Sequence, residues 1–92
     1  MVYYVYMLKS KGIKPITYVG YTIDLKRRIK LHNLGKGAKF TRGRIWKLIY
    51  YKKYTSKNIA LKEEYKLKVN YKLRNLIKKK FIENENISST SL

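Results

Sequence analysis

Residues 2–8 read VYYVYML, an unbroken run of β-branched, aromatic and aliphatic side chains. Such a run is typical of a strand that is covered on both faces of its sheet. Residues 9–15, KSKGIKP, predict a turn, and residues 16–21, ITYVGY, predict a second strand. The chain therefore begins with a predicted β-hairpin.

Both strands of this hairpin contain tyrosines. Period two places Tyr4 and Tyr6 on one face of the first strand, and Tyr18 and Gly20 on one face of the second. Gly20 leaves a gap in that face where another backbone or a ligand could approach closely. Either the tyrosines are cross-strand packing partners, or their hydroxyls belong to a functional site. The strands alone leave both interpretations open.

The segment that follows, residues 22–35, predicts a helix of about three turns. Asp24 is a suitable N-cap, and Gly35 is a suitable residue just past the C-terminus. Arg28 and His32 lie one turn apart beside the apolar stripe of this helix. His32 alone would be interpreted as a partly buried side chain. Together with Arg28, on a helix that packs against the tyrosine hairpin, it forms a candidate site.

Residues 35–44, GKGAKFTRGR, predict a glycine-rich basic loop. Flexible backbone, four cations, a hydroxyl and one aromatic ring suit contacts with phosphates and stacking on a base. A solvated loop in a lysine-rich protein would have the same composition, so both interpretations stay open. The candidate nucleic-acid contacts are Gly20 of the hairpin and the loop cations Lys36, Lys39, Arg42 and Arg44.

The second half of the chain predicts a strand and a helix in succession. Residues 45–54 have the pattern of a third strand, and Thr55 and Ser56 cap a helix from Lys57 to Lys68. One face of this helix carries Ala60, Glu64 and Leu67.

A third, basic helix is predicted over roughly residues 71–82. Its inward face is expected to carry Leu73, Leu76, Ile77 and Phe81. Residues 83–92, ENENISSTSL, are polar and predict a disordered tail. We therefore expect a single domain over residues 1–82 followed by this tail.

Composition points to a polyanionic partner. The 92 residues include 23 Lys and Arg against 5 Asp and Glu, which gives a net charge of +18. Such a charge repels itself unless a polyanion relieves it, so nucleic acid is the expected partner. The chain has no cysteine, no apolar run near the roughly 18 residues of a membrane span, and no signal-peptide pattern. We expect no membrane association and a cytoplasmic, nucleoid-associated location.

The few acids restrict any metal site. Before residue 83 the chain holds only Asp24, Glu63 and Glu64, and Asp24 is the predicted helix cap. Magnesium keeps most of its waters and commonly takes one or two carboxylates together with substrate phosphate oxygens. A single glutamate among cations fits a site that nucleic acid completes. The alternative is a surface pair of Glu64 with Lys68, and helical periodicity does not choose between the two glutamates.

The ordered set of motifs resembles the GIY-YIG nuclease family. It comprises YVY at 4–6, YVG at 18–20, Arg28 with His32, and ALKEEYKLK at 60–68. The resemblance covers about residues 4–68 and continues more loosely into the third helix. The basic loop and the third strand look like the small stand-alone bacterial members related to the nuclease domain of the excision-repair protein UvrC. The first signature departs from many members, which have glycine where this chain has Tyr4.

The resemblance implies an α/β (α+β) domain in the order β-β-α-β-α-α, with a three-stranded antiparallel sheet flanked by helices. It implies a DNA endonuclease that uses one Mg²⁺ or Mn²⁺ ion and no small-molecule organic cofactor. Carried over by position, the catalytic residues are Tyr6, Tyr18, Arg28, His32 and Glu64, with Glu64 as the metal ligand. Which tyrosine takes the proton from water stays open.

These roles carry a chemical requirement. The pKa of free tyrosine lies near 10, so a tyrosine base needs nearby cations, which Arg28, His32 and the metal would supply. Gly20 would make room for the strand that is cut. We expect selectivity for DNA structure rather than sequence, in repair or recombination, and a protein partner could supply specificity. The alternative is a non-catalytic basic nucleic-acid-binding module.

Overall fold

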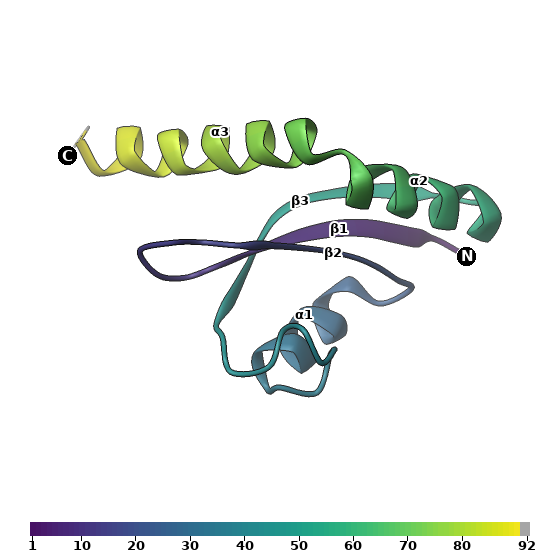
Figure 1. Ribbon diagram of the computed structural model, residues 1–92. Helices are drawn as coiled ribbons and strands as arrows, with labels where there is room; N and C mark the ends of the chain where they lie inside the picture. The colour runs from purple at the N-terminus through teal and green to yellow at the C-terminus, as the bar shows by residue number, and fades with distance from the viewer. Residues whose placement is uncertain (91–92) are drawn as a thin grey trace.

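The protein folds as a three-stranded sheet with helices on both faces (Figure 1). The computed structural model describes residues 1–90. Its elements are β1 (Tyr3–Ser10), β2 (Thr17–Thr22), α1 (Leu25–Asn33), β3 (Trp46–Tyr54), α2 (Lys57–Val69) and α3 (Tyr71–Thr90). This order confirms the α+β prediction. No helix within residues 1–90 is both long enough and apolar enough to cross a membrane.

The first strand is the centre of the sheet. The strand order is β2-β1-β3, and β1 pairs antiparallel with both neighbours. Val5 and Met7 are buried on one face of β1, and Tyr6 and Leu8 are buried on the other. The continuous apolar run therefore forms a strand covered on both faces, as predicted.

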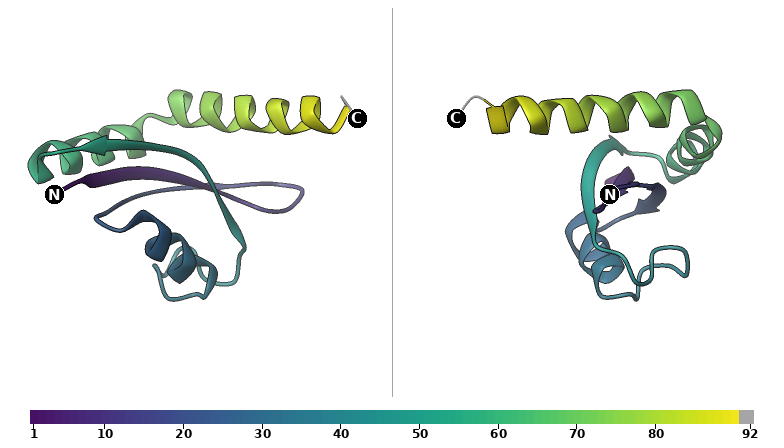
Figure 2. Two further views of the ribbon diagram at one scale, coloured as in Figure 1. Left: turned by 180° about the vertical axis from the view of Figure 1, so that it is seen from behind. Right: turned by 60° about the vertical axis from the view of Figure 1, so that its left-hand side comes forward.

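Two separate cores lie on the two faces of the sheet. Helices α2 and α3 cover one face, and α1 with the basic loop covers the other (Figures 1 and 2). The core on the α2 side consists of Val5, Met7 and Val19 of the sheet with Ala60 and Leu67 of α2. The α1 side is formed by Tyr6, Leu8 and Trp46, with partly buried neighbours that include Tyr18, Leu25 and Ile29. The hairpin thus presents Tyr6 and Tyr18 to α1.

The helix caps confirm the predicted starts. Asp24 Oδ1 accepts a hydrogen bond from Arg27 N at 3.1 Å at the start of α1. Ser56 Oγ accepts one from Ile59 N at 3.3 Å at the start of α2. Gly35, just past α1, adopts a φ of +76°, a conformation that side chains other than glycine rarely adopt.

Helix α3 differs from its prediction. Leu73 and Leu76 were expected to face inward but are 40% and 48% exposed, whereas Ile77 packs against the core. The helix passes over the β1–β2 turn, where Lys78 Nζ donates to Pro15 O at 3.4 Å, and then projects beyond the sheet (Figure 1).

The end of α3 also differs. The helix was expected to stop near Ile82 before a disordered tail, but it continues to Thr90, so that expectation is wrong up to this residue. Residues 83–90 contain no glycine or proline to end a helix, and Glu85 forms an ion pair with Lys47 of β3 at 3.0 Å. Residues 91–92 of the expected tail lie outside the described part of the chain.

Candidate active site

Tyr6 lies fully buried at the centre of the site. It is directly opposite Gly20 in the β1–β2 register. A Cβ atom on Gly20 would lie 2.9 Å from Tyr6 Cε1 and closer still to the hydroxyl. Gly20 therefore makes room for the tyrosine ring, and the expectation that it makes room for a nucleic-acid strand is wrong. The gap left by the missing side chain is already filled.

The Tyr6 hydroxyl is hydrogen-bonded to His32 of α1. Tyr6 Oη lies 2.7 Å from His32 Nε2, and His32 Nδ1 lies 2.9 Å from Thr41 Oγ1. Thr41 Oγ1 donates its own proton to Ala38 O at 3.0 Å. The threonine oxygen is therefore the acceptor for His32 Nδ1–H, which leaves Nε2 to accept from Tyr6. These partners assign a neutral imidazole with its proton on Nδ1.

The basic loop is anchored at its middle by these contacts. Trp46 Nε1 donates to Thr41 O at 2.8 Å, and Asn33 bonds both the N–H and the carbonyl of Trp46. Gly37 packs so closely on His32 that a Cβ would lie 2.9 Å from His32 Cα. Sequence reasoning missed Thr41 and Gly37 as supports of His32. In the sequence, the glycines and the hydroxyl of this basic loop indicate flexibility and contact with phosphates instead.

The four loop cations lie on the surface. Lys36, Lys39, Arg42 and Arg44 are all exposed. They surround the anchored Thr41 and do not enter the cluster around Tyr6. The structure thus leaves them available for long-range attraction of a polyanion.

Burial sets the protonation of the buried groups. Burial raises the pKa of Tyr6 to about 12, although the Arg28 guanidinium acts in the opposite direction. Burial also raises the pKa of Tyr18, again against Arg28. For His32, burial and then the positive charge of Arg28 lower the pKa to about 4. The expected lowering of a tyrosine pKa is therefore wrong for the protein alone, because desolvation outweighs the nearby cation.

Arg28 brings an unsatisfied donor into the site. Its side chain is half-buried, and its Nε atom is buried with no hydrogen-bond partner among the described side chains. A buried donor without a partner is costly. The positive charge of Arg28 acts on the hydroxyls of both Tyr6 and Tyr18, and it opposes the increase in their pKa values.

The structure separates the two glutamates of α2. Glu64 has a side chain that is 21% exposed, and its charge raises the pKa of both Tyr6 and Tyr18. Glu63 instead lines a cavity with Tyr50 and Tyr54 of β3. Of the two glutamates, only Glu64 therefore acts on the hydroxyls of Tyr6 and Tyr18.

Glu64 fits a metal site that substrate completes. Lys68 Nζ is 4.0 Å from Glu64 Oε1, the long limit of an ion pair, so the surface pair considered from sequence is also present. In residues 1–90 no three His, Cys, Asp or Glu side chains gather in a group that could hold a metal ion. A single carboxylate of this kind is compatible with an ion that keeps most of its waters and takes phosphate oxygens.

The four remaining predicted residues form a compact group, which we call the tyrosine–histidine cluster: Tyr6, Tyr18, Arg28 and His32. The ring centroids of Tyr18 and His32 are 5.0 Å apart, and those of Tyr6 and Tyr18 are 6.5 Å apart. These side chains come from β1, β2 and α1. Tyr6 and His32 are 26 residues apart in the sequence and meet only in the fold.

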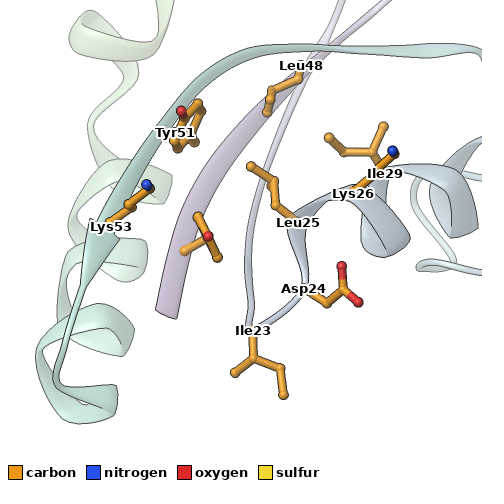
Figure 3. A pocket seen from close by; sticks show the side chains of 9 residues that line it. Ile23, Asp24, Leu25, Lys26, Ile29, Leu48, Tyr51 and Lys53 are labelled. Carbon is orange, nitrogen blue, oxygen red and sulfur yellow. The ribbon is translucent and has the colours of Figure 1, made fainter. Parts of the chain in front are cut away.

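Two cavities adjoin this cluster along the edge strand β2. One, of about 320 Å³, contains Tyr18 in its wall. The other, of about 200 Å³, contains Arg28. A larger cavity, of about 730 Å³, lies between α1 and β3, where Leu25 and Leu48 point toward one another (Figure 3). It contains none of the predicted catalytic residues, so volume does not identify the site.

Comparison with known proteins identifies the family of this chain. The family model for the GIY-YIG catalytic domain matches residues 2–79. A UPF0213 protein of Clostridium perfringens is 47% identical over 87 residues, which cover 90% of each chain. A UPF0213 protein of Oceanobacillus iheyensis is 43% identical over 67 residues, or 72% of this chain and 76% of the relative. The solution NMR structure of a UPF0213 protein from Bacillus halodurans has a TM-score of 0.51 and 41% identity, and the match covers 95% of this chain and 94% of that one.

Proposed function

The chain belongs to the GIY-YIG catalytic domain family, and on that premise we propose that it is a divalent-metal-dependent endonuclease that hydrolyses DNA phosphodiester bonds. The observation that carries the proposal is the buried, unpartnered Arg28 Nε beside Tyr18 and within the electrostatic reach of Glu64. An entering phosphate diester would pair with the Arg28 guanidinium, which lines a cavity at the end of β2, and Glu64 would supply a ligand for the cation. A pure DNA-binding surface has no use for a carboxylate that repels phosphate.

Glu64 holds the Mg²⁺ or Mn²⁺ ion in this proposal. A bound divalent ion polarises the phosphate and neutralises charge on the leaving oxygen. Lys68 lies 4.0 Å from Glu64 in the protein alone, and a bound ion would compete with this weak pairing.

Arg28 stabilises the charge that develops on the phosphate. Its guanidinium is held on α1 with Nε inside the protein, so it is oriented before substrate arrives. A planar donor fork in a water-poor site is well suited to a phosphate with growing negative charge.

The two tyrosines take different roles. Tyr6 is fully buried and donates a hydrogen bond to His32, so it is a positioning residue that orients the imidazole. The contact between the rings of Tyr6 and Tyr18 also positions Tyr18. Tyr18 is half-buried and lines the cavity at β2, so its hydroxyl is the one that contacts water or phosphate. Neutral His32, with a pKa of about 4, does not add a second positive charge next to Arg28.

DNA is the proposed partner, and selection by DNA structure rather than sequence is the proposed specificity. The charge of +18 and the exposed loop cations favour contact with any phosphate backbone. We propose a role in repair or recombination in the cytoplasm, at the nucleoid, with a protein partner that directs the enzyme to its substrate.

Cleavage of labelled DNA tests the proposal. Wild type, Glu64→Ala and the matched control Glu63→Ala are incubated at low salt with single-stranded, duplex and branched DNA, in Mg²⁺, in Mn²⁺ and in EDTA. We expect metal-dependent cutting that Glu64→Ala abolishes and Glu63→Ala retains, while Glu64→Ala still retards DNA in a gel.

Two results would contradict the proposal. Equal loss of cutting in both glutamate variants would remove Glu64 from its special role. Retarded DNA without cutting in any lane would favour the non-catalytic binding module.

A further inference from the structure

The cavity beside Tyr18 contains cationic and aromatic side chains that have no role in the cleavage reaction proposed above. We call it the β2-edge cavity; its walls are Thr17, Tyr18, Val19, Phe40, Lys68 and Arg74. These residues come from β2, the basic loop, α2 and α3. The volume of about 320 Å³ lies at the lower end of the range of small-molecule sites.

Arg74 brings a second unsatisfied donor to this cavity. Its Nε atom is buried and has no hydrogen-bond partner among the side chains described, while one terminal nitrogen donates to Thr17 Oγ1 at 3.1 Å. Contact with the Tyr71 ring at 5.6 Å further fixes the guanidinium. Arg74 is thus held in place with an unused donor, in the same way as Arg28.

Lys68 joins this cavity to the metal ligand. Its ammonium lies 4.0 Å from Glu64 and also lines the cavity wall. The cavity is therefore next to the position at which the scissile phosphate is proposed to bind. A phosphate between Lys68 and Arg74 would be a neighbouring phosphate of the same strand.

Phe40 supplies a platform for a base. Its ring is stacked against Tyr18, with centroids 6.0 Å apart and planes 24° apart, and also contacts Trp46. Its side chain is nevertheless 58% exposed. Because its neighbours hold the ring in place, a base can stack on the free face at little cost in conformational entropy.

We infer that the β2-edge cavity binds the nucleotide next to the scissile phosphate, with its phosphate on Arg74 and Lys68 and its base on Phe40. The inference rests on the proposed nuclease function and specifies its substrate class. A base inside a duplex is covered on both faces by its neighbours, so only an unpaired or extruded base can stack on Phe40. The substrate is therefore DNA with an unpaired nucleotide beside the cut, such as a flap, a frayed end or a single strand.

Fluorescence of 2-aminopurine tests the stacking without any need for cleavage. The probe is a DNA duplex with a short single-stranded flap that carries 2-aminopurine at each position near the junction in turn, bound in EDTA. We expect wild type to change the fluorescence strongly at one unpaired position. Phe40→Ala should remove that change and weaken binding by roughly 5- to 100-fold. Ile45→Ala, a matched control in the same connection with 59% exposure, should do neither.

A neutral phosphate tests the second contact. Replacing single phosphates of the same DNA by methylphosphonates should weaken wild-type binding most at one position near that base. Arg74→Ala should lose this dependence, and its salt slope should fall by about 0.7. Lys79→Ala, an exposed cation of α3, should keep the dependence.

The outcomes separate this inference from the proposed function. A localised fluorescence change that depends on Phe40, in a protein that cuts no DNA, would support the nucleotide site and refute the nuclease. Metal-dependent cutting with no localised change, or with the same change in paired and unpaired probes, would refute the nucleotide site.

Discussion

The pH dependence of stability should report the buried state of His32. This side chain is 0% exposed, and its pKa in the folded protein is lowered from 6.5 to about 4. Between these two values the unfolded chain takes up a proton that the folded chain does not, so acid favours unfolding. The stabilisation is fully present above pH 6.5 and is lost as the pH falls toward 4. The difference corresponds to about 3 kcal/mol in total, and to about 2 kcal/mol between pH 7 and pH 5.

Urea unfolding at several pH values measures this effect. The free energy of unfolding of wild type should fall between pH 7 and pH 5 by about 2 kcal/mol more than that of His32→Gln. Because the chain has a single histidine, one imidazole signal in the NMR spectrum follows the same titration. A midpoint near 6.5, or equal pH slopes in the two proteins, would refute the assignment of a buried neutral imidazole.

Three further predictions concern the same site. Gly20→Ala should reduce the free energy of unfolding by about 1–3 kcal/mol, because its Cβ overlaps the buried Tyr6 ring; a change below about 0.5 kcal/mol in urea unfolding would show that the ring can move. Thr41→Val should cost about 1–3 kcal/mol, because it leaves His32 Nδ1–H unpaired; a stability equal to that of wild type would show that this hydrogen bond does not support His32. Tyr18→Phe should slow DNA cleavage by about 10²–10⁴-fold with little effect on stability, whereas Tyr6→Phe should also lower stability, because His32 Nε2 loses its donor; the reverse pattern in paired melting and cleavage assays would exchange the two roles.

Local patterns predicted the elements of the fold well. The apolar run of β1, the Asp24 and Ser56 caps and the glycine after α1 each act within a few residues, so sequence alone could place them. The end of α3 was mispredicted because its residues are polar and show no apolar pattern of a packed helix. In the structure Glu85 pairs with Lys47, which is far away in the chain.

The candidate site was less accessible to sequence reasoning. Periodicity placed Tyr6 and Gly20 on matching faces but did not reveal that the two residues are directly opposite and that one fills the space of the other. The support of His32 by Thr41 depends on how the basic loop folds back on α1. The pKa values depend on burial, which a list of nearby charges does not contain, and so even the direction was wrong for the tyrosines.

Binding of Mn²⁺ in the presence of DNA tests the central claim, that Glu64 and the tyrosine–histidine cluster share one phosphate and metal site. Amide NMR signals are recorded with substoichiometric Mn²⁺ and a DNA oligonucleotide whose scissile linkage is replaced by an uncleavable analogue that keeps the negative charge of the phosphate. We expect paramagnetic broadening centred on Glu64 and the residues around Tyr18 and Arg28, and its loss in Glu64→Ala but not in Glu63→Ala. Broadening centred elsewhere, or unchanged in Glu64→Ala, would contradict it.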